Sequence, residues 1–229
     1  MIDLHAHVLP LVDDGSNNLT DSLKMLIEAE AQGVTDIVLT PHRRRKFCKS
    51  KEELNKAFES FCLEKEKAGI SINLYLGQEI YISNGYKKLF TNGEILPLCD
   101  SNYFLIEFDF VEETDVSEVV YVLAKQGFVP VVAHFERYSY ANIDMAREIK
   151  ALGGLIQVNA QSLVGKGKFK FRKLTSKLFK EGLVDIVASD IHCGRVNCMK
   201  KAYTFVSKKY GKQIAEDVFK LNAKKIIKG

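Results

Sequence analysis

The sequence predicts an α/β fold in which parallel strands close into a distorted, TIM-like (β/α)7 barrel. Seven short apolar runs of strand type recur along the chain, and they end at residues 7, 42, 79, 107, 134, 159 and 190. The intervals between these ends, 25 to 37 residues, each suit one strand, one helix and their loops. Six of the seven ends carry a histidine or a carboxylate. A closed barrel brings all strand ends to one mouth, whereas an open doubly wound sheet would leave the outer ones far apart.

The predicted strands are apolar runs bounded by turn residues. The first run leads directly into His5 and His7, and the i, i+2 spacing places both rings on the same face of a strand. The other strands are expected at residues 36–40, 72–78, 103–107, 129–133, 155–159 and 184–189.

Helical spacing of apolar residues fills the intervals between the strands. A helix over 20–32 precedes Gly33, and a capping box at Ser50 begins a helix that ends near Ala68. Further helices are expected at 116–126, 142–152, 171–181, 199–209 and 213–222, and the stretch 80–100 is irregular or holds a short helix. Residues 165–168 (Gly-Lys-Gly-Lys) lack the spacing of a phosphate loop, so we expect a flexible basic turn there.

Composition narrows the class of protein. With 46% hydrophobic and 27% charged residues, the chain is an ordinary globular sequence, and no linker divides it, so we expect a single domain over residues 1–229. A formal net charge of +4 is too small to indicate nucleic-acid binding. Five cysteines without a CxxC pair predict reduced thiols in a cytoplasmic protein. The sequence has no signal-peptide pattern and no apolar run of about 18–20 residues, so no membrane span is expected.

The polar residues at the strand ends predict a metal centre. A charge that directly follows a buried strand is costly unless a partner neutralises it, and several such charges suggest a shared cluster of cations. The alternative is a set of partly buried histidines with ordinary hydrogen bonds. Behind His7, two adjacent acids could add another oxygen ligand, although for Asp13 we favour a role in the turn. The other candidate ligands are His5, His7, His42, Glu79, Glu107, His134, Asp190 and His192.

A ligand set of this size implies two or three ions that share bridging carboxylates. Nitrogen and oxygen ligands without thiolate suit manganese, iron or zinc. Clustered ions of this kind serve in-line displacement at phosphorus, in which a bridging hydroxide attacks. Arg137 and Arg195, each three residues after a candidate histidine, offer planar contacts to a phosphoryl group, or else form surface salt bridges. The basic run 43–46 is a solvated turn or attracts an anionic substrate.

A series of motifs then resembles the PHP-domain protein-tyrosine phosphatases of bacteria, which accompany the tyrosine kinases of capsule and exopolysaccharide synthesis. The resemblance runs in register from residue 1 to about residue 205. The motifs are Met-Ile-Asp-Leu-His-Ala-His-Val-Leu-Pro, Val-Asp-Asp-Gly-Ser, Thr-Pro-His, Gly-Gln-Glu, Ile-Glu-Phe, Ala-His-Phe-Glu-Arg-Tyr and Ala-Ser-Asp-Ile-His.

This resemblance implies a PHP fold with a trinuclear site, usually of manganese, and hydrolysis of phosphotyrosine, typically on the tyrosine-rich tail of the kinase. By motif, the eight candidate ligands carry over, Asp14 is chosen over Asp13 as the ninth, and Arg137 falls on the arginine of the His-x-Glu-Arg stretch. The chain departs from many relatives at Arg43, where they have histidine, and at Phe135, where they have proline. The segment between His192 and its following arginine is also shorter here.

Three other functions compete with this prediction. A thiol-based phosphatase is suggested by His192-Cys193, but the sixth residue after Cys193 is Met199 and not the arginine that such a loop needs. A small-molecule phosphoesterase, such as a histidinol-phosphate phosphatase of the same superfamily, is the closest competitor. A catalytically silent metal module that serves as a binding partner would not need nine ligands around one mouth.

Overall fold

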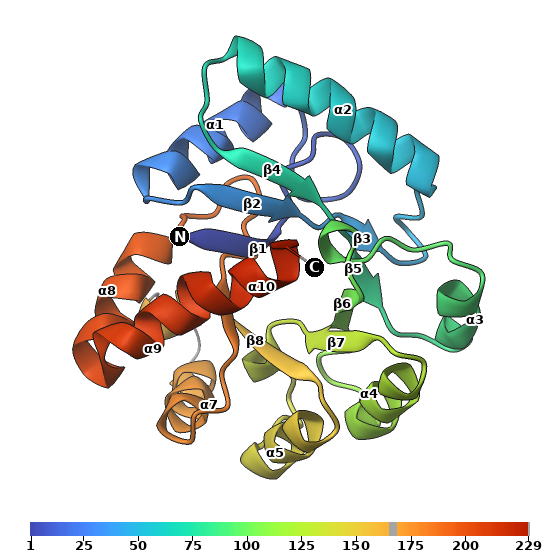
Figure 1. Cartoon of the computed structure of the whole chain (residues 1–229), viewed down its shortest axis with the longest axis vertical. Helices are drawn as coiled ribbons and strands as arrows, with labels where there is room; N and C mark the ends of the chain where they lie inside the picture. The colour runs from blue at the N-terminus through green and yellow to red at the C-terminus, as the bar shows by residue number, and fades with distance from the viewer. Residues whose placement is uncertain (165–168, 229) are drawn as a thin grey trace.

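The structure, a computed structural model, describes residues 1–164 and 169–228. Its strands pair in parallel within a curled sheet, and helices cover the outside of the curl (Figure 1). The predicted turn at 165–168 lies outside the described residues. The strands are β1 (Ile2–Ala6), β2 (Asp36–Leu39), β3 (His42–Arg43), β4 (Asn73–Leu76), β5 (Glu79–Tyr81), β6 (Tyr103–Glu107), β7 (Val129–Val132), β8 (Leu155–Asn159) and β9 (Ile186–Ala188).

The strands form two hydrogen-bonded groups, β1-β2-β4 and β3-β5-β6-β7-β8-β9. The predicted strands 36–40 and 72–78 are each interrupted near their carboxyl ends, and the chain resumes pairing as β3 and β5. Pro41 has no N–H for the first ladder. At the second break, a Cβ on Gly77 would lie 2.8 Å from Leu98 Cδ2, so only glycine lets the strand approach this close. These breaks start a new short strand at His42 and at Glu79.

The first and last strands lie side by side. Ala6 forms an isolated parallel bridge with Ile191, and the His7 amide donates to the Ile191 carbonyl over 3.0 Å. The Asp190 amide donates to the His5 carbonyl over 2.8 Å. Backbone hydrogen bonds therefore fix the carboxyl end of the last strand against that of the first.

Most helices lie where the sequence predicts them. Ser50 forms the expected capping box of α2 with Glu53, and both halves of the box are present. Two segments differ: the short helix α6 directly after β8 was not predicted, and the last helical stretch runs on to Lys228 through a π-helical segment, Asp217–Leu221. The helices are α1 (Leu19–Ala31), α2 (Lys51–Lys67), α3 (Tyr86–Thr91), α4 (Val116–Lys125), α5 (Ile143–Ala151), α6 (Ala160–Val164), α7 (Phe169–Lys180), α8 (Met199–Tyr210), α9 (Lys212–Glu216) and α10 (Asn222–Lys228), with 3-10 turns η1 (Leu98–Asp100) and η2 (Phe135–Arg137).

Two apolar cores hold this arrangement together. The larger one fills the space between the strands and the outer helices. The smaller one lies inside the curl, where Leu4, Val38 and Leu105 meet Ala223 and Ile226 of α10. Helix α10 crosses the centre of the curl in Figure 1 and packs against β1 and η1. This inner core holds the strands in register below the polar residues at their carboxyl ends. Among the described residues, no helix is both long and apolar enough to cross a membrane.

Candidate metal centre

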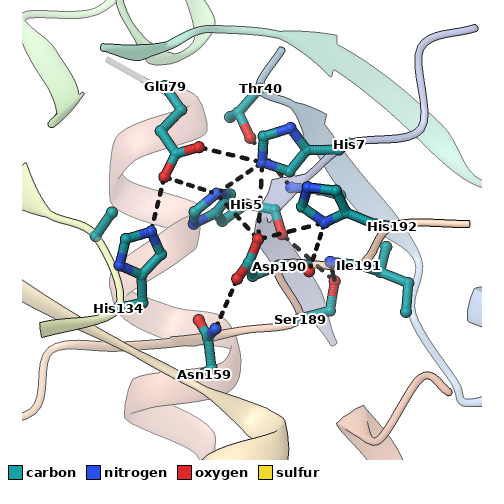
Figure 2. A network of polar contacts seen from close by, with 12 residues as sticks. His5, His7, Thr40, Glu79, His134, Asn159, Ser189, Asp190, Ile191 and His192 are labelled. Atoms are coloured by element: carbon teal, nitrogen blue, oxygen red, sulfur yellow. Dashed lines mark hydrogen bonds and ion pairs between the residues drawn. The ribbon is translucent and has the colours of Figure 1, made fainter. Parts of the chain in front are cut away.

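The polar residues that follow the strands meet at one place. The rings of His5, His7, His134 and His192 turn toward the carboxylates of Glu79 and Asp190 (Figure 2). Every one of the eight residues selected from the strand ends is buried, with at most 8% of its surface exposed. Since buried charges need partners, the crowding itself indicates a common bound group.

The centre of the cluster is formed by the first and last strands together with Glu79. The Nε2 atoms of His5 and His7 lie 3.1 Å apart, and both lie 3.7 Å from Asp190 Oδ1. Glu79 Oε1 lies 3.3 Å from His5 Nε2, and Glu79 Oε2 lies 3.2 Å from His7 Nε2. Ligand atoms of four residues therefore surround one small volume from several sides.

Two more groups extend the cluster. Glu79 and Glu107 lie beside His42, whose Nδ1 is 2.8 Å from Glu79 Oε2 and 3.9 Å from Glu107 Oε2. His134 Nε2 lies 2.9 Å from Glu79 Oε1 and 3.5 Å from Glu107 Oε1. Three overlapping sets of side chains have ligand atoms close enough to hold an ion: His5, His7 and Asp190; His7, His42 and His192; and His42, Glu79 and Glu107.

Several buried atoms of the cluster lack a hydrogen-bond partner. Such atoms indicate whether the cluster suits a bound cation, because a cation would satisfy them. Among the described residues, His42 Nδ1, Glu79 Oε2 and Glu107 Oε2 are buried without a hydrogen-bond partner. His42 Nδ1 and Glu79 Oε2 approach to 2.8 Å, yet their geometry is not that of a hydrogen bond. An unsatisfied buried polar atom costs about 1–3 kcal/mol, and native proteins keep few of them. Nitrogen and carboxylate oxygen atoms unpaired at one point fit divalent transition metals.

Neighbouring opposite charges shift the pKa values in the cluster: they raise those of two histidines and lower those of two carboxylates. Burial alone would lower the pKa of His7 and His134, but neighbouring carboxylates outweigh it. Asp13 and Glu79 raise the pKa of His7 well above its usual value, and Glu107 with Glu79 raises the pKa of His134 to about 10. Burial would likewise raise the carboxylate pKa values, but the surrounding histidines hold the pKa of Glu79 and that of Asp190 well below the ordinary range. Protons on these histidines therefore balance the buried carboxylates, and bound cations would balance the same charges.

His192 behaves differently from the other two shifted histidines. Burial, followed by the positive charge on His7, lowers its pKa to about 4. Its ring stacks on that of His7 with centroids 4.2 Å apart, and its Nδ1 lies 3.1 Å from the Asp190 carbonyl. His192 is thus neutral at pH 7, which is the state in which imidazole ligates a metal.

Local backbone conformation aims these side chains inward. His134 (φ 31°) and Asp190 (φ 50°), each two residues beyond the end of its strand, both have left-handed backbone, an uncommon state for residues other than glycine. Strain of this kind concentrates at functional sites. Close approach also matters at Gly15, where a Cβ would lie 2.2 Å from His7 Cβ and from the His7 carbonyl oxygen. The loop after β1 can fold back over His7 only because residue 15 is glycine.

The two adjacent acids of this loop have separate roles. Asp13 has the expected turn contact, since its Oδ1 accepts from the Gly15 amide, but its Oδ2 also accepts from His7 Nδ1 over 2.7 Å and from the His42 amide over 3.0 Å. A carboxylate on the far nitrogen of a ligand histidine fixes its orientation. Asp14 lies at the rim, with Oδ1 3.4 Å from His42 Nε2 and 3.9 Å from His192 Nε2. The contact of Asp13 with His7 was not predicted from the sequence.

Two further residues that hold the ligands in place were not predicted. Their side chains are amides, not the imidazoles or carboxylates expected of metal ligands. Gln157, a polar residue inside the apolar run of β8, accepts from the His134 amide over 2.8 Å and lies 3.1 Å from His5 Nδ1. Asn159 ends the one strand without a candidate ligand, and its side chain donates to Asp190 Oδ2 over 2.8 Å. The sequence offered one signal for Gln157, because this polar residue lies within an otherwise apolar run. All seven predicted strand ends therefore contribute to this site.

Both candidate arginines lie beside Asp190. Arg137 donates to Asp190 Oδ2 over 2.9 Å, and its guanidinium lies over the Phe110 ring, 4.4 Å from the centroid. Arg195 donates to the Asp190 carbonyl over 3.3 Å and remains 44% exposed. The two residues line a pocket of about 350 Å³ that reaches the cluster at Asp190, and Phe171 is another of its lining residues. The pocket combines an apolar wall with two cations, which suits an aryl phosphate.

The basic run 43–46 is more than a solvated turn. Arg44 pairs with Asp14 over 2.8 Å, and Arg43 lies 3.6 Å from Glu94. Phe47 stacks near His42, and the cations of Arg44 and Lys46 lie over its ring. This segment forms one wall of the mouth, next to His42 and the rim residue Asp14.

Two features define the class of this protein: a curled parallel sheet, and a buried cluster of histidines and carboxylates at the carboxyl ends of its strands. It is an α/β protein whose catalytic centre can hold clustered metal ions. Residues 1–228 match the family described as "Capsular polysaccharide synthesis, CpsB/CapC". The chain belongs to this family.

Curated relatives and solved structures agree with that membership. The chain is 37% identical to tyrosine-protein phosphatase CpsB of Streptococcus pneumoniae, with 99% of this chain and 98% of the relative covered. It is 31% identical to tyrosine-protein phosphatase YwqE of Bacillus subtilis, over 84% and 77% of the two chains. A structure from work on YwqE and CpsB, described as "unique metal-dependent tyrosine phosphatases", superposes with a TM-score of 0.92 at 29% identity and covers 100% and 94% of the two chains. A mutant organophosphorus hydrolase shares the fold alone, with a TM-score of 0.64 at 12% identity and 99% and 92% coverage.

Proposed function

We propose that the chain is a metal-dependent protein-tyrosine phosphatase of capsule or exopolysaccharide synthesis. The observation that carries this proposal is the convergence of five imidazoles and three carboxylates, all buried, next to two arginines at one mouth. Family membership and the tyrosine-phosphatase relatives support it. The same comparisons do not favour a small-molecule phosphatase such as one for histidinol phosphate.

The proposed ligands are the nine residues His5, His7, Asp14, His42, Glu79, Glu107, His134, Asp190 and His192. Seven of them, all except Asp14 and His134, form the three overlapping sets, which suit two to three divalent ions, with manganese expected and iron or zinc compatible with the same donors. When bound, such ions act as Lewis acids toward a phosphoryl group and supply a nucleophile at neutral pH.

The protein's own residues supply orientation and charge. Arg137 and Arg195 present guanidinium groups to the pocket, where they can bind phosphoryl oxygens by two-point contacts. The Arg137 guanidinium lies over the Phe110 ring, a contact that restricts its movement. Asp13 and Gln157 hold the rings of His7 and His5 from behind. In this arrangement the arginines bind the substrate phosphate while the buried cluster is reserved for cations.

The wider setting of the protein is part of the same proposal. We take residues 1–229 as one phosphoesterase domain of the PHP type, with β2/β3 and β4/β5 each counted as one interrupted strand of a distorted seven-stranded barrel. The parallel bridge between Ala6 and Ile191 supports closure of that barrel. The phosphotyrosine substrate is expected to be the tail of a tyrosine kinase of the polysaccharide system. Five free cysteines support a cytoplasmic location.

Metal content and substrate preference test the proposed function together. Purified protein should hold two to three equivalents of transition metal, hydrolyse phosphotyrosine peptides faster than phosphoserine peptides or histidinol phosphate, and lose activity with chelator but not with a thiol-alkylating reagent. The rates are measured by phosphate release, and the metals by elemental analysis. Full activity of metal-free protein in excess chelator, or a preference for histidinol phosphate, would contradict the proposal.

A further inference from the structure

Charge is distributed unevenly over the outer helices. Helices α7 and α8 carry nine lysine or arginine residues and no acidic residue in 24 positions. The other 205 residues then have a formal net charge of −5, although the whole chain has +4. The net positive charge of this protein is therefore carried by this pair of helices, both of which are labelled in Figure 1.

These helices enclose a groove of about 410 Å³. Ser176 of α7 and Tyr210 of α8 meet with their oxygens 3.1 Å apart, and the rings of Phe179 and Tyr210 stack at 4.8 Å, so the two walls are fixed against each other. Phe169, which is 79% exposed, lines the same groove. The cations that line it are Arg172, Lys173, Lys177, Lys180 and Lys209.

The cations of the groove lack acidic partners. Within residues 1–164 and 169–228, none of the five forms an ion pair, whereas the neighbouring Lys150 and Arg147 pair with Asp185 and Glu181. Lys173 and Lys177 stand four residues apart on the same helix, and like charges at this spacing destabilise a helix. An anionic ligand would relieve that repulsion, so the arrangement favours a negatively charged occupant.

The groove adjoins the pocket that contains Arg137 and Arg195. Ser162 lines both, and α7 begins at their junction, where Phe171 faces the arginine pocket. Lys170 Nζ donates to the Ser139 carbonyl over 2.8 Å, which fixes the start of α7 beside η2 and its Arg137. A chain that occupies the arginine pocket can therefore continue into the groove.

We propose that the groove between α7 and α8 docks an acidic segment of the same protein substrate whose phosphotyrosine enters the arginine pocket. This inference rests on the proposed function and adds the class of sequence that it recognises. Helix α7 is about 18 Å long at 1.5 Å per residue, a length that an extended peptide spans in roughly five or six residues. The acidic residues should lie within that distance of the phosphotyrosine, on one side of it.

The test compares peptides and charge-reversal variants of the metal-loaded enzyme. The substrates are a phosphotyrosine peptide with four glutamates on one side of the phosphotyrosine, the same peptide with glutamines, and p-nitrophenyl phosphate. The variant is Lys173→Glu/Lys177→Glu on α7. The matched control is Lys224→Glu/Lys228→Glu on α10, because these two lysines are also exposed and also four residues apart. The acidic peptide is made in two versions, with the glutamates before or after the phosphotyrosine.

With the α7 variant, KM for one of the acidic peptides should rise about 10-fold while kcat stays the same, because charge reversal at a docking site acts on association. Rates on the glutamine peptide and on p-nitrophenyl phosphate should remain within twofold of wild type, and the α10 control should behave as wild type. Added salt should weaken the preference for the acidic peptide, since the cations are exposed. Equal KM values for both variants on both acidic peptides would overturn the proposal.

A binding measurement separates this inference from the proposed function. The acidic peptides with phenylalanine in place of phosphotyrosine should bind wild type and the α10 control, as followed by fluorescence polarisation, and should bind the α7 variant weakly. If such binding occurs while phosphotyrosine is not hydrolysed, the proposed function fails and the docking site stands. If the α7 variant instead loses binding to phosphatidylglycerol vesicles or to single-stranded DNA but keeps wild-type KM for the acidic peptides, the groove has another occupant and the docking proposal is wrong.

Discussion

At the scale of single residues, the site is defined by side chains that cannot satisfy one another. Five imidazoles meet Glu79, Glu107 and Asp190 in a space where burial penalises every uncompensated charge. The sequence predicted these ligands because each polar residue directly follows an apolar run. Asp13 and Gln157 were not predicted as supports, since a turn aspartate and a strand glutamine become informative only once His7 and His5 have been placed beside them.

Substitution of Arg137 can distinguish metal binding from binding of the phosphoryl group. Arg137→Ala removes a cation that carries no ligand atom for a metal, so metal content should stay near wild type while kcat falls by roughly 10²-fold, the effect of losing one preorganised donor. Arg137→Lys should recover little, because an ammonium can neither make the planar two-point contact nor stack in the same way on Phe110. Turnover and bound metal are measured on the same samples.

Two controls accompany this comparison. Arg147→Ala removes an arginine whose side chain is 57% exposed and paired with Asp144 and Glu181, and it should leave both quantities unchanged. His7→Ala should lower metal content and turnover together. Wild-type turnover in Arg137→Ala would make Arg137 a structural partner of Asp190, and Arg195 would be the next residue to test.

At the scale of elements, the loop after β1 determines how closely the chain packs against His7. Gly15→Ala should destabilise the protein by about 1–3 kcal/mol, because the new Cβ would meet backbone atoms that have no free space to move into. The loop must also move off His7, so metal content should fall. Asn17→Ala, an exposed position in the same loop, is the control. Denaturant unfolding and metal analysis check the outcome, and an unchanged midpoint with full metal would show that the loop adapts.

The elements also show what a sequence pattern can predict. Strand ends and helix limits followed from apolar runs, capping residues and glycines, as at Ser50 and Gly33. The interruptions after β2 and β4 were not predicted. Pro41, at the first break, is visible in the sequence, whereas the second break depends on a distant segment, because Leu98 is what requires glycine at position 77. The helix α6 was missed since its five residues are too few to show a period.

At the scale of the whole molecule, metal uptake and proton release should be linked. The pKa of His134 is raised to about 10, so we expect this ring to be protonated in the metal-free protein at pH 7, whereas a ligating imidazole must be neutral. Loading metal at pH 7 should therefore release protons, and the apparent affinity should increase with pH. Calorimetric titration with metal in two buffers of different ionisation enthalpy measures the number of protons.

The same shifts fix the sign of the stability effect. Because the folded-state pKa of His134 is raised, its contribution to the stability of the metal-free protein is complete below about pH 6.5 and is lost as the pH rises toward about 10. Metal-loaded protein should lack that decline, since the ion replaces the proton. A metal uptake that releases no protons at pH 7 would show that the histidines are already neutral.

The hydrogen bonds between β1 and β9 also have a consequence for synthesis on the ribosome. His5 and Asp190 are 185 residues apart in the sequence, yet the backbone of one holds the backbone of the other. At translation rates of 5–20 residues per second, roughly 10 to 40 s pass between the emergence of the first strand and that of its partner. During this interval the nascent chain has no complete cation site, so a truncated product cannot acquire the full metal cluster. Every active copy must therefore be a chain that was translated past its ninth strand.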